Sequence, residues 1–451
     1  MDKITNALQC TTDTKELIIG EGVTAQTGKM FKKLFPGKKA IIVADNNTWI
    51  AAGKTVQSSL VSEAIKQDSP FIFTGDHFHA EWKYVEELEE VLKKTDAIAI
   101  AVGSGVINDL TKLVSRHCNK QYICVATAAS MDGYTAFGSS ITYQGNKQAY
   151  DCPAPVGCIF DPEIAAIAPK ELAASGYADL IAKIPAGADW MLADAVGAEK
   201  LDEFSWNLVQ NGLRESLSSP GAVLEGDIKA TEALGEGLIM SGFAMQALQS
   251  SRPASGTEHQ FSHCWDMENL SFEGQLVSHG FKVGIGTLVS TALIEFLLEE
   301  DFSVLDVENC VDVWKNWQET EKDIYRIFEG KPGHISRALY ETKNKHVSKA
   351  ELREQLNALK AAWPELKNKL QAQLIPFSEV RENLKQAGAP YEPEMIGISR
   401  ERLLKTLGYI PYMRSRFANI DIVFRCGLME KYATKLFGQG GIWEINKKNI
   451  N

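Results

Sequence analysis

Three of the chain's eight histidines fall in one short segment, between Ser250 and Gly286: His259, His263 and His279. Imidazole nitrogen is a preferred ligand of Zn²⁺, Ni²⁺ and Fe²⁺, and a helix fixes the direction in which the ring points. The segment has helical patterning, and His259 and His263 are one turn apart on the same helix face. A lone histidine is more often a hydrogen-bonded core side chain, but three this close together favour a site for one divalent ion.

A carboxylate that could complete this site lies upstream, at Asp179 in the segment ASGYADLIAK. A carboxylate among apolar helix residues is costly to bury unless it is paired or bound to a metal. The alternative is a solvent-facing Asp179, with Tyr177 and Leu180 turned inward. One carboxylate and two imidazoles leave a coordination position open for a substrate oxygen, so the residues are compatible with a Lewis-acid centre.

A glycine-containing turn follows the apolar run DAIAIAV and opens a helix: Gly103, Ser104, Gly105, Val106 and Ile107. Glycine lets the backbone approach a pyrophosphate, and a helix N-terminus favours its negative charge. The full G-x-G-x-x-G pattern is absent because position 108 is Asn, so an ordinary strand-to-helix turn explains the segment equally well. Asp45 ends the earlier run KAIIVA, where it could accept hydrogen bonds from a ribose diol or simply cap a helix.

A second polar stretch follows the run QYICVA, and it contains Thr127, Ala128, Ala129, Ser130 and then Asp132. Ligands of open α/β sheets bind along the edge formed by the carboxyl ends of the strands. Hydroxyl groups and Asp132 at this edge could hold nicotinamide or substrate hydroxyls. A structural turn rich in small residues is the competing interpretation.

The pattern of apolar runs predicts an α/β fold. Continuous apolar runs at residues 39–44, 96–102, 121–126 and 156–160 alternate with helical spacing at 47–66 and 81–94, which is typical of a doubly wound, Rossmann-like parallel sheet. After residue 169 the helical pattern dominates, through 173–195, 204–217, 222–249 and 275–298. We therefore predict a Rossmann-like dinucleotide-binding domain at 1–168 and an all-helical domain at 169–451, which binds metal and substrate and carries a helical insertion around 300–400.

Composition narrows the class of protein. The net charge of −11 argues against a nucleic-acid-binding or membrane-surface protein, because phosphate groups attract positive charge. No uninterrupted apolar run approaches the roughly 20 residues that span a bilayer. The cysteines are scattered without a Cys-x-x-Cys pair, and the first ten residues lack an apolar signal core. These features predict a cytoplasmic location, and a homodimer is the usual default.

Together these segments resemble the iron-containing alcohol dehydrogenase and dehydroquinate synthase-like superfamily, and within it most closely the glycerol-1-phosphate dehydrogenase family. The matching segments cover nearly the whole chain in order: GSGVINDLTK (103–112), TAASMDGYTA (127–136), ASGYADLIAK (174–183), SSRPASGTEH with FSH (250–263), SHG (278–280) and RSRFANIDI (414–422). The SMDGYT and SRPASG-x-EH segments are specific to this branch.

The resemblance implies a role for each of these segments. Asp45, Gly103 to Ile107 and Thr127 to Ser130 would hold NAD or NADP, with NAD favoured because the charge of Asp45 would repel a 2′-phosphate. Asp179, His259 and His279 would bind one divalent metal, Zn²⁺ or Ni²⁺ with Fe²⁺ also compatible. Asp132, Asp179 and His263 would contact the substrate. The implied catalytic residues are Asp179, His259, His263 and His279.

The implied reaction is reversible hydride transfer between NAD(P)H and dihydroxyacetone phosphate, which gives sn-glycerol 1-phosphate. Proton delivery is expected through His263 or a water, and Arg252, Lys183 and Lys282 are candidates for holding the phosphate. Three alternatives remain at this stage. They are a sugar phosphate cyclase like dehydroquinate synthase, a glycerol or polyol dehydrogenase acting on an unphosphorylated substrate, and a helical interaction protein that has lost enzymatic function.

Overall fold

The computed structural model describes residues 7–9, 11–75, 78–144 and 146–445. By their contacts the residues form two compact units. The first comprises Met1–Leu180, Phe204–Ser251 and Gln386–Ala389, and the second comprises Ile181–Glu203, Arg252–Lys385 and Pro390–Asn451. The predicted domain boundary at 168/169 divides the chain by element type instead, and it stays a prediction.

The first unit is built on a six-stranded parallel sheet with the strand order β1-β8-β5-β4-β2-β3. The strands are β1 (Glu16–Ile19), β2 (Ala40–Asp45), β3 (Phe71–Phe73), β4 (Ile98–Gly103), β5 (Tyr122–Ala126) and β8 (Gly157–Phe160). Every residue of β4, β5 and β8 is buried, as expected for strands covered by helices on both faces. The doubly wound parallel sheet predicted from the sequence is confirmed.

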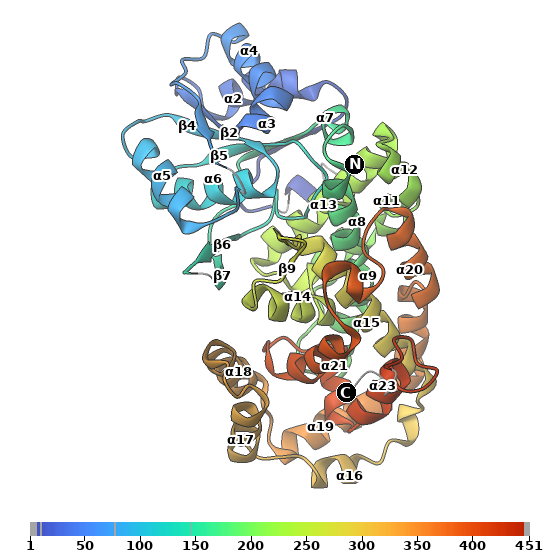
Figure 1. Cartoon of the computed structure of the whole chain (residues 1–451). Helices are drawn as coiled ribbons and strands as arrows, with labels where there is room; N and C mark the ends of the chain where they lie inside the picture. The colour runs from blue at the N-terminus through green and yellow to red at the C-terminus, as the bar shows by residue number, and fades with distance from the viewer. Residues whose placement is uncertain (1–6, 10, 76–77, 145, 446–451) are drawn as a thin grey trace. The chain divides into compact units, whose positions relative to one another are not determined.

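Helices of this unit cover both faces of the sheet. Figure 1 shows α2 (Thr27–Leu34), α3 (Asn46–Thr48) and α4 (Lys54–Ser62) on one side of the strands, and α5 (Trp82–Leu92) and α6 (Gly105–His117) on the other. From β2 the chain moves outward to β3, whereas from β4 it moves the opposite way to β5. The carboxyl ends of β2 and β4 therefore flank the point where the winding direction reverses, which is where open α/β sheets bind ligands.

A buried lysine anchors the loop that follows β5. Lys112, on α6, is 1% exposed, and its Nζ donates hydrogen bonds to the backbone oxygens of Gly133, Ala136 and Gly138 at 2.9, 2.8 and 2.9 Å. From the same helix Asn108 donates to the Gly133 oxygen at 3.2 Å. Backbone carbonyls buried away from water need such partners, so α6 fixes the conformation of the loop that carries Asp132.

The same loop lies directly against two helices, α8 (Lys170–Ile181) and α13 (Ile228–Leu248). A Cβ added at Gly176 of α8 would lie 1.9 Å from the backbone oxygen of Ala129, and one added at Gly242 of α13 would lie 2.2 Å from the Thr135 hydroxyl oxygen. Real Cβ atoms do not make such short contacts, so both helices need glycine at their point of contact with the loop.

The second unit is helical, and two of its helices cross at a glycine. They are α14 (Thr257–Met267) and α15 (His279–Glu299). A Cβ added at Gly286 of α15 would lie 2.3 Å from the backbone oxygen of Glu258 on α14, so the two backbones meet directly there. Of the described helices, α15 is long and apolar enough to cross a membrane. However, 78% of its most apolar stretch is buried inside the protein, as is typical of a core helix.

The remaining helices surround these elements. Before α14 they are α7 (Pro162–Ala166), α9 (Lys183–Ala195), α10 (Glu203–Gln210), α11 (Leu213–Ser216) and α12 (Pro220–Glu225). After α15 they are α16 (Val307–Asp312), α17 (Trp317–Ile327), α18 (Pro332–Lys345), α19 (Lys349–Gln373), α20 (Phe377–Gln386), α21 (Arg400–Tyr409), α22 (Asn419–Arg425) and α23 (Met429–Phe437). The predicted capping box at Ser348 is present, since its side chain accepts from the amide of Glu351.

Two antiparallel hairpins depart from the sequence-based expectations. One pairs β6 (Ser139–Tyr143) with β7 (Asn146–Tyr150), and the other pairs β9 (Ser271–Phe272) with β10 (Gln275–Leu276). The helix predicted from residue 275 is therefore wrong over its first four positions. Its true start is fixed by Ser278, whose hydroxyl accepts the amide hydrogen of Phe281 at 3.3 Å.

We predict that Lys112→Met destabilises the first unit by about 3 kcal/mol, because three backbone carbonyls lose the hydrogen bond from the buried ammonium at once. Urea unfolding followed by circular dichroism measures the change. Arg116→Met is the matched control, since Arg116 is exposed on the same helix, and its unfolding midpoint should stay unchanged. Equal stability of the Lys112→Met variant and the parent would contradict the anchoring role of the lysine.

Candidate functional site

The two helices that meet at Gly286 also carry the predicted histidines. His259 is on the first turn of α14 and is 7% exposed, and His279 is the first residue of α15. The centroids of their rings are 5.4 Å apart. Because α14 and α15 pack backbone to backbone, the separation of the two rings is set by the helix crossing rather than by flexible loops.

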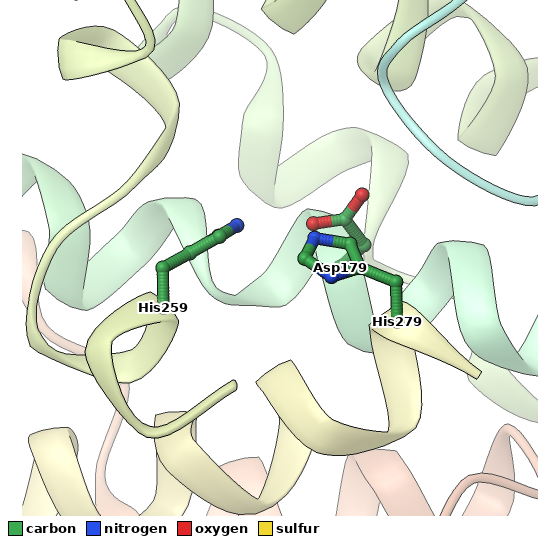
Figure 2. Close-up of side chains that lie close together, drawn as sticks. All are labelled: Asp179, His259 and His279. Atoms are coloured by element: carbon green, nitrogen blue, oxygen red, sulfur yellow. The ribbon is translucent and has the colours of Figure 1, made fainter. Parts of the chain in front are cut away.

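Asp179 brings a carboxylate to the same place. One ligand atom each from Asp179, His259 and His279 lies within 4.8 Å of the other two, and Figure 2 shows the His259 ring directed toward the other two side chains. Asp179 is 1% exposed, which excludes the solvent-facing alternative. His259 is also buried and His279 is half-buried. Two imidazole nitrogens and one carboxylate oxygen in such a group fit the donor preferences of Zn²⁺, Ni²⁺ and Fe²⁺.

Neighbouring side chains determine which nitrogen of each ring faces this group. Nδ1 of His259 lies 2.8 Å from Oε1 of Glu258, and Nδ1 of His279 lies 3.3 Å from the hydroxyl of Ser262. The Nε2 atoms are thus left as the metal-facing donors. A carboxylate behind a ligating imidazole fixes its tautomer and orientation and raises its basicity.

Glu258 is a site residue that the sequence reasoning missed. Its side chain is fully buried, and Oε1 also accepts the amide hydrogen of Gly256 at 2.5 Å. A second buried carboxylate, Asp189 on α9, accepts the amide hydrogens of Thr257 and Asn419, both at 2.7 Å. Burial raises the pKa of both carboxyls. The position of Glu258 directly before a candidate ligand was the available sequence signal, whereas nothing near Asp189 pointed to it.

His263 lies one turn beyond His259, with ring centroids 6.5 Å apart, and is not one of the three residues whose ligand atoms converge. Its Nε2 contacts Nη1 of Arg414. Burial, and then the charge of Arg414, holds the pKa of His263 well below its usual value, so the ring is neutral at neutral pH. Since the guanidinium donates to Nε2, the single ring proton is on Nδ1.

Asp132, predicted to contact substrate, lies next to the Asp179 carboxylate in the first unit. Its backbone nitrogen is 3.4 Å from Oδ2 of Asp179, and its own Oδ2 accepts a hydrogen bond from the hydroxyl of Ser241 at 2.9 Å. Ser241, on α13, is a further residue that the sequence reasoning did not identify. The loop conformation set by Lys112 therefore places Asp132 beside one of the three candidate ligands.

The residues predicted to hold the nucleotide lie at the carboxyl edge of the sheet. Asp45 and Gly103 end the neighbouring strands β2 and β4, and a Cβ at Gly103 would lie 2.5 Å from Cβ of Ile107, so only glycine fits this turn. Asp45 also caps α3, since its Oδ1 accepts the amide hydrogen of Thr48 at 2.8 Å. The cap uses Oδ1, and the second carboxylate oxygen, Oδ2, could accept a hydrogen bond from a ribose hydroxyl. Capping and ribose binding are therefore compatible.

The stretch from Thr127 to Ser130 is buried against the rest of the unit. The amide of Thr127 donates to the oxygen of Gly103 at 3.2 Å, which joins the two predicted nucleotide-binding segments. The hydroxyl of Ser130 lies 2.9 Å from that of Tyr134, which in turn donates to the oxygen of Ala128 at 2.7 Å. The Ser130 hydroxyl is thus held by Tyr134, and nucleotide binding by Thr127 to Ser130 stays a prediction.

Of the three cations suggested for phosphate binding, Arg252 and Lys282 pair with carboxylates in the second unit. Nε of Arg252 lies 3.1 Å from Oε2 of Glu199, and its guanidinium lies over the Trp190 ring at 5.4 Å. Lys282 contacts Asp266, and the Lys183 side chain is fully buried in α9. A role of these three residues in phosphate binding stays a prediction.

Comparisons with known proteins identify relatives in both sequence and fold. Residues 18–169 match the model of the iron-containing alcohol dehydrogenase family. The solved structure of glycerol dehydrogenase from Schizosaccharomyces pombe has the same fold, with a TM-score of 0.59 at 17% identity over 94% of this chain and 91% of that one.

Two curated relatives are both named glycerol-1-phosphate dehydrogenase, NAD(P)+. The relative from Geobacillus thermodenitrificans is 32% identical over 253 residues, which cover 55% of this chain and 62% of the relative. The relative from Pyrococcus furiosus is 32% identical over 280 residues, which cover 62% of this chain and 78% of the relative. The chain thus spans just under two thirds of the first relative and more than three quarters of the second. Given this coverage, the chain belongs to the glycerol-1-phosphate dehydrogenase family.

Proposed function

We propose that this chain is a metal-dependent oxidoreductase that reversibly transfers hydride between NAD(P)H and dihydroxyacetone phosphate to give sn-glycerol 1-phosphate. The observation that carries the proposal is the convergence of buried Asp179, buried His259 and half-buried His279, side chains of the types that divalent ions prefer. Family membership supports the substrate class and the nicotinamide cofactor. The protein would act as a cytoplasmic homodimer on a small phosphorylated ketone or polyol.

The metal would be held by Asp179 and by Nε2 of His259 and His279. When bound, it polarises the substrate carbonyl as a Lewis acid. The nicotinamide dinucleotide would lie along the edge formed by Asp45, Gly103–Ile107 and Thr127–Ser130. At this edge the N-terminus of α6 favours the pyrophosphate charge.

The remaining residues would orient the substrate. Asp132, fixed by Ser241 and by the anchored loop, would accept a hydrogen bond from a substrate hydroxyl. Neutral His263 carries its single ring proton on Nδ1 while Arg414 occupies Nε2, so Nδ1 would donate a hydrogen bond to the substrate oxygen, and a water molecule would supply the proton of the product hydroxyl.

The decisive experiment is an assay of NADH oxidation with dihydroxyacetone phosphate, before and after chelation and with Zn²⁺, Ni²⁺ or Fe²⁺ restored. We expect turnover that is lost on chelation and regained with at least one metal, and about one metal ion per chain by mass spectrometry. His259→Ala should lose both the metal and at least 1000-fold in kcat/KM, because the carbonyl is no longer polarised.

The matched control is His117→Ala, which removes an exposed histidine of α6 and should keep both metal and activity. A fully active His259→Ala enzyme that retains stoichiometric metal would refute the ligand assignment. Phosphate release without net NADH oxidation would indicate a cyclase instead, and equal rates on glycerol and glycerol 1-phosphate would indicate a polyol dehydrogenase.

A second prediction concerns Glu258 as a positioning residue. Glu258→Gln keeps the shape but removes the negative charge behind His259, so we expect metal affinity to fall by about 10- to 100-fold. Competition with a chromophoric chelator measures this, and the melting temperature of the metal-free protein shows whether the fold is intact. Glu268→Gln, at the other end of α14, is the control and should bind metal as tightly as the parent. Unchanged affinity in Glu258→Gln would count against this role.

A third prediction concerns the choice of cofactor. Asp45→Asn keeps an oxygen that can accept the amide hydrogen of Thr48 but removes the charge that would repel a 2′-phosphate. The ratio of kcat/KM for NADPH to that for NADH should rise roughly tenfold, which corresponds to about 1.4 kcal/mol. Asp96→Asn removes the same charge just before the amino end of β4 and should leave the ratio as it is. If both variants behave alike, Asp45 does not face the ribose.

A further inference from the structure

The second unit contains a large polar pocket that none of the roles above uses. It has a volume of about 700 Å³, and we call it the arginine pocket because four arginines contribute to its lining. The charged residues that line it are Arg337, Arg414, Arg416, Arg425, Lys345, Glu199, Glu341 and Glu351. Five cations and three carboxylates therefore line the pocket, in a chain whose overall charge is −11. Of the five cations, Lys345 pairs with Asp421, which is outside the lining, at 2.7 Å. A local excess of positive charge in an acidic protein indicates an anionic ligand.

Each of the three carboxylates of the lining has a partner other than Arg414 and Arg416, although Glu341 also acts on the charge of Arg414, and Glu199 on that of Arg416. Glu341 pairs with Arg337 at 2.6 Å and accepts the amide hydrogen of Ser415 at 2.7 Å. Glu199 pairs with Arg252, which is outside the pocket lining, at 3.1 Å. Glu351 accepts the amide hydrogen of Ser348 at 2.7 Å as part of a helix cap. Part of the negative charge of the pocket wall is thus taken up by groups other than Arg414 and Arg416.

Arg414 and Arg416 are the centre of the positive charge. Nη1 of Arg416 donates to the backbone oxygen of Ser255 at 3.0 Å and contacts the hydroxyl of the same residue. Burial lowers the pKa of both guanidinium groups, and that of Arg416 is lowered further by the charges of Arg414 and Arg252. These like charges repel one another, the charge of Glu258 offsets part of the repulsion, and a bound anion would offset more of it.

The pocket reaches the candidate site through Arg414. Arg414 touches Nε2 of His263, and His263 is one helical turn from His259. In dihydroxyacetone phosphate the carbonyl carbon and the phosphate are separated only by a methylene group and an ester oxygen. A carbonyl held at the candidate metal centre therefore requires a phosphate site nearby. The guanidinium of Arg414, which contacts His263, lies close enough to His259 to provide one.

We propose that Arg414 and Arg416 bind the phosphate of the substrate and thereby set the preference for phosphorylated over free ketones and polyols. Arginine suits this task because its planar guanidinium can offer two parallel hydrogen bonds to a phosphate. The proposal rests on the proposed function, since it assumes that the substrate carries a phosphate monoester. The 2′-phosphate of NADP offers the same chemistry, so the test separates these two sources.

The test uses the metal-loaded full chain and the variants Arg414→Gln and Arg416→Gln. For each, kcat/KM is measured with dihydroxyacetone phosphate and with dihydroxyacetone, and KM is measured for NADH and NADPH. We expect the selectivity ratio between the two ketones to fall about 100-fold in each variant, the change expected when a charged phosphate contact of about 2.7 kcal/mol is lost. Arg414→Lys and Arg416→Lys should give intermediate ratios, because lysine keeps the positive charge but cannot offer two parallel hydrogen bonds to the phosphate.

Arg353→Gln is the matched control. Arg353 is paired with Glu308 on the surface, outside the pocket lining, and its variant should keep the parent's ratio and melting temperature. An unchanged ratio in the Arg414 and Arg416 variants would overturn the proposal, as would an equal loss on both ketones or a loss confined to the KM for NADPH.

Direct binding of inorganic phosphate, measured by calorimetry, separates this proposal from the proposed function. Phosphate binding that disappears in Arg416→Gln, in a protein that does not reduce dihydroxyacetone phosphate, would leave the anion site standing and refute the function. Turnover of dihydroxyacetone phosphate with phosphate binding and selectivity unaffected in both variants would do the reverse.

Discussion

The candidate centre depends on one close contact, the crossing of α14 and α15 at Gly286. A side chain at this position would collide with the backbone oxygen of Glu258, one residue before His259. Both helices carry a candidate ligand at or near their first residue, so the crossing fixes two imidazoles before any ion binds. Preorganised ligands of this kind do not have to be gathered from mobile positions when the metal arrives, and the cost of ordering them is met during folding.

The first unit uses the same principle with different chemistry. Its loop after β5 has no regular hydrogen bonding of its own, and the ammonium of Lys112 supplies what the carbonyls lack. Glycines at 176 and 242 let α8 and α13 approach the loop closely enough to contact its backbone. The buried ammonium of Lys112 and the glycines at 176 and 242 thus fix the loop conformation. This conformation places Asp132 beside Asp179.

The sequence predicts best what local pattern encodes. Strands β4 and β5 are uniformly apolar, and β-strands buried on both faces have no other requirement, so they could be located directly. The β9–β10 hairpin could not, because its two-residue strands are exposed and carry no alternation. The candidate ligands His259 and His279 were readable from residue type and helical setting. The contact between Arg414 and His263 joins residues 151 positions apart, so no local sequence pattern could predict it.

The placement of His259 in the first turn of α14 accounts for a further feature of the site. A carboxylate that orients a ligating imidazole must stay ionised, yet burial raises the pKa of Glu258. The first turn of a helix offers unpaired amide hydrogens and a positive dipole end, both of which favour negative charge. Glu258 accepts one amide hydrogen there and Asp189 accepts another, while the charges of Lys183 and Arg416 lower the pKa of Glu258. A histidine in mid-helix would have no such support, so the helix start is the position at which this pair of residues can work.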